Sequence, residues 1–350
     1  MTHVLVIDEG HAGHLTQSRG LATALAARIG ADTEIVSAKL TLRGLLRPLL
    51  QLATDHARHG LPNWVLRLAY DWSDDIGALR AEVIVTSGGK GLYFATSLAR
   101  RLGATLVFCG DPAPLPARWC DVILSPVPVP GHPHVIETEL LLTEMSPARI
   151  VGRGGEYREA FVRMGGIRLA ALLVGGDSRS HRYTTLDWRA LVDGINRLGA
   201  TGWRWLISTS PRTPPAVEAM LRSLVDPRYL VKSVWWHARP ERVVVDFFGA
   251  ADIVAVTQDS LSMLSEAMAA GKPVLSLVPA EVRHSAFLES VLAAQEARRR
   301  MIRVPIARLG DQAVRADQFM TVESDLAADY AVRVAELLSA RSGTHHAGQP

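Results

Sequence analysis

The feature that most constrains the fold is a repeated alternation of short apolar runs with segments of helical periodicity. In the first part of the chain the apolar runs are HVLVID (residues 3–8), AEVIVTS (81–87), ATLVFCG (104–110) and DVILS (121–125). After the first run, Leu21, Leu25 and Ile29 recur at helical spacing, and a second helical segment ends at Gly103. Short strands alternating with helices are typical of a parallel sheet covered by helices.

The same alternation restarts after residue 160. Five further apolar runs predict strands, namely IRLAALLV (167–174), WRWLIST (203–209), ERVVVDF (241–247), DIVAVT (252–257) and PVLSLV (273–278). Thr184 and Asp187 predict a capping box at the start of a helix between the first two of these runs. We therefore expect an α/β chain of two Rossmann-like parallel-sheet domains facing a cleft. Their expected limits are 1–160 and 161–342, followed by a flexible tail over 343–350.

The composition excludes several classes of protein. Hydrophobic residues make up 48% of the 350 residues, which is enough for a sizeable core, and the net charge is only +3. The arginines are spread along the chain, so no nucleic-acid-binding stripe is expected. Cys109 and Cys120 lack metal-ligand spacing and are interpreted as reduced structural thiols. With no signal peptide and no apolar run approaching the ~20 residues that span a bilayer, we expect a cytoplasmic protein.

In doubly wound sheets the ligand lies outside the carboxyl ends of the strands, so the residues that follow each strand are informative. The segment VTQDSLSMLSEAMAAGKPV (256–274) reads as strand, turn, helix and strand, with Ser260 and Ser262 at the helix start. Unpaired N–H groups there favour an anion, and Glu266, four residues after Ser262, shares that helix face. This combination suits a nucleoside diphosphate. Alternatively, Asp259 and Ser260 only cap the helix and Glu266 is solvated.

The loop DEGHAGHLTQ (8–17) after the first strand is the second candidate. An unperturbed histidine, with a pKa of ~6.5, suits proton transfer near neutrality, so His14 is a candidate general base. Asp8 and Glu9 are competing bases. Alternatively, His14 only orders the loop. His11 and His14 lack a nearby third ligand, so no metal is expected.

Two further loops follow strands of the second domain. Gly176, Asp177 and Ser178 predict a second phosphate-compatible loop, although a glycine pair is often only a turn. In STSPRTP (208–214), Ser210 and Arg212 are positioned to clamp a diphosphate, and the alternative is a surface loop shaped by prolines.

The stretch FFGAADIVAVTQDSLSMLSEAMAAGKPV resembles the donor-site region of GT-B glycosyltransferases. More closely, the chain is similar to a bacterial and plant family of mitochondrial fission, or elongated-mitochondria, proteins, whose bacterial members include lipooligosaccharide outer-core glycosyltransferases. The resemblance covers nearly the whole chain and also rests on GHLTQSRGLATAL (13–25) and STSPRTP. Gly13, His14 and Gln17 match the family's Gly-His-x-x-Gln element. Pro211 stands where the family more usually has the first of two arginines.

The resemblance implies a glycosyltransferase that moves a sugar from a nucleotide-sugar to a saccharide or glycolipid acceptor of the lipopolysaccharide or lipooligosaccharide type. It implies an N-terminal acceptor and catalytic domain and a C-terminal donor domain, without a metal or other cofactor. His14 and Glu9 are the expected catalytic residues. The expected nucleotide-sugar-binding residues are Gly13, Gln17, Gly176, Asp177, Ser178, Ser210, Arg212, Asp259, Ser260, Ser262 and Glu266. A nucleotide-sugar epimerase and a non-catalytic binding or scaffold protein remain alternatives.

Residues 40–72 combine leucine, tryptophan and arginine. A helix of this composition usually packs against its own domain, but basic amphipathic helices with aromatic residues also lie on membranes. The sequence leaves both interpretations open, the second being a peripheral contact with the inner membrane.

Overall fold

The computed structural model describes residues 3–72, 77–312 and 314–346. The chain forms two compact units, the first made of residues 1–144 and 326–350 and the second of residues 145–325. Each unit is built around its own six-stranded parallel sheet. Among the helices that the structure describes, none combines the length and the apolarity needed to cross a bilayer.

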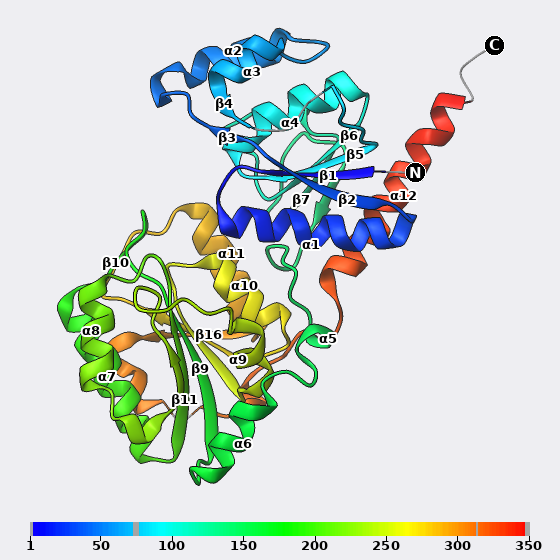
Figure 1. Ribbon diagram of the computed structural model, residues 1–350. Coiled ribbons are helices and arrows are strands. Elements are labelled where there is room, and N and C mark those ends of the chain that lie inside the picture. The colour runs from blue at the N-terminus through cyan, green and yellow to red at the C-terminus, as the bar shows by residue number, and fades with distance from the viewer. Residues whose placement is uncertain (1–2, 73–76, 313, 347–350) are drawn as a thin grey trace. The chain divides into compact units, whose positions relative to one another are not determined.

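The sheet of the first unit has the strand order β2-β1-β5-β6-β7-β8. Its strands are β1 (His3–Asp8), β2 (Asp32–Ser37), β5 (Val83–Ser87), β6 (Thr105–Cys109), β7 (Val122–Ser125) and β8 (Val135–Glu137). The helices are α1 (Ala12–Ile29), α2 (Arg47–His56), α3 (Asn63–Ala69), α4 (Gly89–Leu102) and α12 (Leu326–His346). Short strands β3 (Lys39–Leu40) and β4 (Tyr70–Asp71) pair with each other, and 3₁₀ turns cover Gly44–Leu46 (η1) and Ala117–Trp119 (η2) (Figure 1).

Both faces of this sheet are buried, which explains why its strands read as continuous apolar runs. Leu5 and Ile7 of β1 point into one core, whereas Val4 and Val6 point into the other. The first core is closed by α4 together with α2 and α3, and the second by α1 and α12. Figure 1 shows α1 running along one face of the sheet and α4 along the other.

The sheet of the second unit has the order β12-β11-β9-β13-β14-β16. Its strands are β9 (Arg168–Val174), β11 (Trp203–Thr209), β12 (Leu230–Val234), β13 (Ile253–Thr257), β14 (Val274–Val278) and β16 (Met301–Pro305). The helices are α5 (Pro147–Ile150), α6 (Gly155–Arg163), α7 (Thr185–Ala200), α8 (Pro215–Leu224), α9 (Val244–Ala250), α10 (Leu261–Ala269) and α11 (Ala286–Ala297). Strands β10 (His181–Arg182) and β15 (Glu281–Val282) form a two-stranded antiparallel sheet, and 3₁₀ turns cover Pro227–Tyr229, Ile306–Asp311 and Ala316–Gln318.

The strand orders fix where a ligand is expected in each unit. In the first sheet β1 has β2 on one side and β5 on the other, and in the second sheet β9 lies between β11 and β13. Chain connections leave in opposite directions at these two points, and the loops that follow the strands there are where such sheets bind ligands. The candidate loops after β1, β9 and β13 all begin at such a switch point.

One strand prediction was wrong. The run ERVVVDF (241–247) leads into helix α9, which begins at Val244, instead of forming a strand. The apolar pattern continues past residue 247. Its buried members have the spacing of one helix face, namely Val243, Phe247, Ala250 and Ala251. The predicted capping box of Thr184 and Asp187 is confirmed at the start of α7.

The limits of the units differ from the expected 1–160 and 161–342. Helices α5 and α6 belong to the second unit, where both pack on α9. Helix α12 returns to the first unit because it packs along α1. It continues through residues 343–346 of the expected tail, and residues 347–350 lie outside the described residues.

Candidate active site

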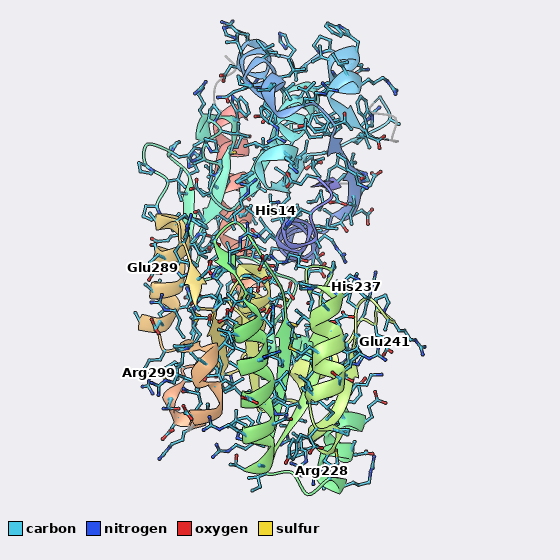
Figure 2. All side chains as sticks on the ribbon, turned by 90° about the vertical axis from the view of Figure 1, so that its left-hand side faces the viewer. His14, Arg228, His237, Glu241, Glu289 and Arg299 are labelled. Atoms are coloured by element: carbon cyan, nitrogen blue, oxygen red, sulfur yellow. The ribbon has the colours of Figure 1, made fainter. Side chains whose placement is uncertain are left out.

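A carboxylate–imidazole pair occupies the switch point of the first unit. Glu9 directly follows β1, and His14 lies in the first turn of α1, at the position labelled in Figure 2. Nδ1 of His14 lies 2.6 Å from Oε1 of Glu9, whose side chain is 3% exposed, whereas that of His14 is 35% exposed. In the neutral imidazole, a carboxylate acceptor places the hydrogen on Nδ1, which leaves Nε2 with a lone pair. The pair therefore has the arrangement of an oriented base.

The Glu9 carboxylate is held ionised by its surroundings. Oε2 accepts a hydrogen bond of 2.7 Å from the N–H of Gly91, in the first turn of α4. Burial raises the pKa of Glu9, but the His14 bond and charge and the Gly91 N–H outweigh it, so the pKa lies below its ordinary value. The ionised form therefore contributes stability above the ordinary pKa of ~4.3, and that stability is lost as the pH falls through the lowered value.

Gly88 makes the close approach of this pair possible. It has φ +82, and a Cβ built on it would lie 2.3 Å from Nδ1 of His14 and 2.5 Å from Oε1 of Glu9. Any side chain at position 88 would therefore push the pair apart.

We expect Gly88→Ala to lower turnover by ~10²-fold, because a displacement of about 1 Å at a reacting group has an effect of that size. Gly103→Ala is the matched control, since Gly103 has φ +66 but no atom within 4 Å of the Cβ position. Gly103→Ala should lose about 1–2 kcal/mol of stability from its left-handed backbone, and Gly88→Ala at least as much, because its side chain also meets the pair. Equal turnover in the two variants, in an assay of the purified proteins, would contradict this role of Gly88.

The neighbouring candidates of the first unit have other positions. Asp8 accepts a hydrogen bond of 2.7 Å from the N–H of Gly10, which shapes the loop. Gly13 lies inside the first turn of α1 and is half-buried. Gln17 lies near the Glu9–His14 pair in sequence but is buried, and its Oε1 accepts a hydrogen bond of 3.2 Å from Ser87. Direct ligand binding by Gln17 stays a prediction.

Helix α10 begins at the switch point of the second unit, as the sequence predicts. Ser260 is its N-cap, with Oγ accepting from the N–H of Met263 at 3.4 Å. The hydroxyls of Ser260 and Ser262 lie 3.2 Å apart. Glu266 is half-buried one turn further along the helix. The start of α10 thus presents hydroxyls and the positive end of a helix dipole, which together suit an anionic group.

Asp259, just before α10, is the centre of a buried network. Its side chain is 0% exposed, and Oδ2 lies 2.8 Å from Nη2 of Arg212. The Tyr183 hydroxyl donates to Oδ1 at 2.9 Å, and the N–H of Gly176 donates to Oδ2 at 3.2 Å. Burial, followed by the charge of Asp259, raises the pKa of Tyr183 far above its ordinary value, so this hydroxyl keeps its proton. Asp259 therefore joins the loops that follow β9, β11 and β13.

The glycine pair after β9 serves close packing. A Cβ at Gly175 would lie 2.2 Å from the Asp259 carboxylate, and one at Gly176 would lie 2.1 Å from the carbonyl oxygen of Arg212. The N–H of Gly175 donates to Oγ1 of Thr257 at 2.7 Å. Since the N–H groups of both glycines have partners within the unit, phosphate binding by them stays a prediction that would require those bonds to break.

Asp177 and Ser178 shape the turn that follows. Asp177 accepts from the N–H of Tyr183 at 2.9 Å and pairs with Arg182 at 2.9 Å. The backbone bond from Tyr183 is the largest cause of its lowered pKa. The Ser178 hydroxyl accepts from the N–H of His181 at 3.1 Å. Both residues act within their own loop in this structure.

Ser210 and Arg212 belong to a similar turn after β11. The N–H of Ser210 donates to Oγ1 of Thr213 at 3.0 Å, and Ser210 Oγ accepts from the N–H of Arg212 at 3.3 Å. The Arg212 side chain is 43% exposed, so part of its guanidinium faces solvent while the rest pairs with Asp259.

A buried amide and two histidines form a cluster that the sequence reasoning missed. Oε1 of Gln258 lies 3.2 Å from Nε2 of His181 and 3.0 Å from Nε2 of His284. Nδ1 of His284 lies 2.6 Å from Glu289. The cluster links the loop after β9 to the segment after β14, which strands β10 and β15 also join. The position of Gln258 directly after a predicted strand was the one available signal.

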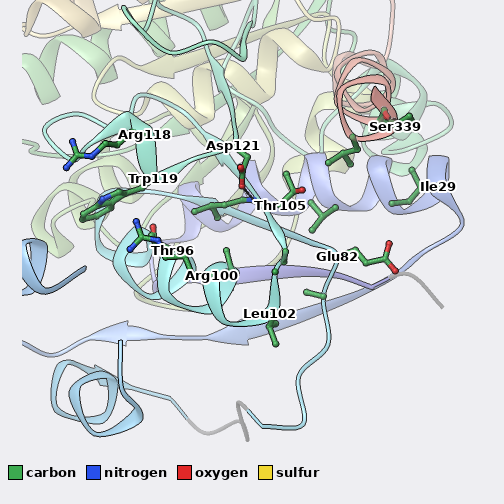
Figure 3. A pocket seen from close by; sticks show the side chains of 18 residues that line it. Ile29, Glu82, Thr96, Arg100, Leu102, Thr105, Arg118, Trp119, Asp121 and Ser339 are labelled. Atoms are coloured by element: carbon green, nitrogen blue, oxygen red, sulfur yellow. Dashed lines mark hydrogen bonds between the residues drawn. The ribbon is translucent and has the colours of Figure 1, made fainter. Parts of the chain in front are cut away.

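A hollow of about 980 Å³ in the first unit lies away from these residues. Its lining includes Glu82 and Thr105 at the amino ends of strands, together with the end of α4 and part of α12 (Figure 3). Ligands of such sheets bind at the carboxyl ends, so this hollow is not assigned a role. Within the described residues, no group of three or more His, Cys, Asp or Glu side chains could hold a metal ion.

Solved structures of several proteins are similar to this one over nearly the whole chain. A co-structure of S. aureus MnaA with UDP has a TM-score of 0.60 at 11% identity and covers 95% of each chain. Phytolacca americana UGT2 complexed with UDP-2fluoro-glucose and pterostilbene has a TM-score of 0.50 at 11% identity, covering 95% of this chain and 93% of the other. These likenesses and the two six-stranded parallel sheets show the GT-B fold predicted from the sequence.

No curated protein matches the chain significantly in sequence. The family model described as mitochondrial fission ELM1 matches residues 12–321, which is most of the chain. The chain belongs to the mitochondrial fission ELM1 family.

Proposed function

We propose that the protein transfers a sugar from a nucleotide-sugar donor to a hydroxyl of an acceptor. The observation that carries the proposal is the pair of buried Glu9 and partly exposed His14 at the switch point of the first sheet. A second polar group, at the start of α10, occupies the corresponding point of the second sheet. A base and an anion site are the two components that transfer from a nucleoside diphosphate requires.

The second unit would bind the donor. Ser260 and Ser262 at the start of α10 would receive the diphosphate, assisted by the exposed part of Arg212. Glu266 would accept hydrogen bonds from the ribose hydroxyls. The UDP in the MnaA structure and the UDP-2fluoro-glucose in the UGT2 structure support a nucleotide-sugar as the ligand class.

The first unit would supply the base. Nε2 of His14 would take the proton from the acceptor hydroxyl as that oxygen attacks the sugar carbon. The Glu9 carboxylate fixes the ring and stabilises the imidazolium that forms, while the departing diphosphate is stabilised by Arg212 and the N–H groups of α10. This scheme uses only residues of the chain and requires no metal or other cofactor.

The acceptor is proposed to be a saccharide or glycolipid of the lipopolysaccharide or lipooligosaccharide type. This part rests on the family resemblance in the blocks at residues 13–25 and 256–274. A glycolipid acceptor implies that the protein works at a membrane surface.

The proposal is tested by incubating the protein with a panel of nucleotide-sugars and a cell-envelope glycolipid extract. Formation of nucleoside diphosphate that depends on the acceptor is expected. An isomerised sugar without acceptor would identify an epimerase instead, and binding without turnover would identify a scaffold. A ligand at ~100 times its dissociation constant adds about 2.7 kcal/mol to the free energy of unfolding. If no nucleoside diphosphate at millimolar concentration raises the melting temperature, the assignment of the donor site is wrong.

We expect Glu266→Gln to weaken binding of the preferred nucleoside diphosphate by roughly ten-fold. Hydrogen bonds to a charged acceptor contribute ~1.5–3 kcal/mol, against about 1 for a neutral one. Isothermal titration of the variant measures the effect, and Glu159→Gln, at a side chain that is 75% exposed, is the control. Unchanged affinity would leave Glu266 a structural carboxylate.

A further inference from the structure

Large apolar side chains lie in solvent on the outer side of the 3₁₀ turn η1 and of helices α2 and α3. Leu45, Leu49 and Leu52 are 92%, 63% and 57% exposed and follow one another at the spacing of one helix face. Trp64 and Leu68, one turn apart on α3, are 70% and 67% exposed. We call these five side chains the outer apolar face. Solvent exposure of such side chains is unfavourable unless something covers them.

The outer apolar face belongs to firmly attached helices. Leu50 of α2 and Leu66 of α3 are buried in the core of the first unit, on the opposite sides of the same helices. Arg100 of α4 donates hydrogen bonds to the carbonyl oxygens of Thr54 and Ala57, where α2 ends. Figure 1 shows both helices at the edge of the first unit, outside α4. The leucines are therefore presented by packed helices and not by an unfolded segment.

The charge around this face is positive. Four exposed arginines flank it, namely Arg43, Arg47, Arg58 and Arg67. Between residues 41 and 69 the sequence has one carboxylate, Asp55. Its Oδ1 is already bonded to Arg118 at 2.5 Å and to the indole N–H of Trp119 at 2.8 Å. Among the described residues none of these four arginines forms an ion pair, so the surface combines exposed leucine and tryptophan with charged arginine.

The exposed apolar side chains and the arginines together indicate what covers the outer apolar face. In a symmetric pair of identical chains the same patch meets itself, so a second copy would bring these arginines against one another. Arginine stems extend along apolar material while the guanidinium reaches anionic groups, and tryptophan favours the boundary between apolar and polar layers. We propose that the outer apolar face binds a lipid bilayer with anionic headgroups, the leucines and Trp64 entering the acyl boundary and the arginines meeting the headgroups. This assigns a surface to the membrane contact proposed above, and its test does not depend on sugar transfer.

The test is sedimentation of the full chain with vesicles of phosphatidylcholine alone or with ~30% phosphatidylglycerol. The wild type should bind the anionic vesicles, and added salt should weaken binding because it screens the arginines. Trp64→Ser/Leu68→Ser should lower the partition coefficient at least ~10-fold through the loss of inserted apolar area. Leu186→Ser, at a leucine of the second unit that is 75% exposed, is the matched control and should bind as the wild type does.

Arg43→Gln/Arg58→Gln should reduce the preference for anionic over neutral vesicles while leaving the melting temperature unchanged. The proposal is overturned if the wild type stays in solution with anionic vesicles, or if Trp64→Ser/Leu68→Ser binds as well as the wild type. If the wild type self-associates and Trp64→Ser/Leu68→Ser does not, the outer apolar face binds a second copy of the chain, which would also overturn the proposal. A melting-temperature shift by nucleoside diphosphate, measured on each variant, reports the donor site separately from vesicle binding.

Discussion

His14→Ala should lower turnover by ~10²–10⁴-fold while donor affinity stays nearly unchanged, because the substitution removes a general base and no group of the donor site. His14 belongs to the first unit, whereas the residues proposed to hold the diphosphate and the ribose belong to the second. Steady-state kinetics with the preferred nucleotide-sugar, together with titration of its nucleoside diphosphate, separates rate from affinity. An equal loss of both would make His14 a donor-binding residue.

Two neighbouring variants sharpen this experiment. Glu9→Gln keeps an acceptor for Nδ1 but removes the charge that stabilises the imidazolium. Its turnover should therefore lie between that of the wild type and that of His14→Ala. His11→Ala removes an adjacent ring, centred 4.4 Å from that of His14, and should change turnover little. Because the pKa of Glu9 is lowered, a loss of activity between pH 5 and 7 would not arise from protonation of Glu9.

The sequence predicted those parts of the fold that depend on local pattern. The apolar runs that became β1, β5, β9 and β13 are buried on both faces of a parallel sheet, so the positions between their ends are apolar or small. The strand prediction for residues 241–247 was wrong because a window of seven residues does not distinguish a β-branched strand from a helix with one buried face. The longer spacing through Ala251 carries the helical period.

The contacts of the candidate site could be predicted only in part. Ser260 as a helix N-cap follows from its position between an apolar run and a helical one, and the structure confirms it. In contrast, Glu9 bonds Gly91 and Asp259 bonds Tyr183 across separations of 82 and 76 residues. Such pairs exist because the order of the strands brings their loops together, and no local pattern encodes that order.

This difference changes what is expected of Arg212. The sequence predicts that Arg212 clamps a diphosphate. In the structure its guanidinium also neutralises the carboxylate of Asp259, which is 0% exposed. The network around Asp259 joins three loops, so disrupting it should affect the second unit before any ligand is present. Substitution of Arg212 therefore probes both the fold and the binding of the donor.

We expect Arg212→Ala to destabilise the protein without ligand by about 2–3 kcal/mol, because it leaves Asp259 as a buried charge with only neutral donors. The full effect of breaking a buried pair is ~3–5 kcal/mol, and we lower it because solvent screens an arginine that is 43% exposed. For a unit of this size the melting temperature should fall by about 5–10 °C.

Arg239→Ala is the matched control, since Arg239 is 87% exposed and its ion pair with Glu241 spans 3.8 Å, so its melting temperature should not change. Arg212→Lys keeps the charge but not the planar fork, and should recover part of the stability. If Arg212→Ala melts like the wild type and loses only affinity for nucleoside diphosphate, the arginine acts on the ligand alone. Loss of both would mean that one side chain joins the loops of the second unit and also meets the leaving diphosphate.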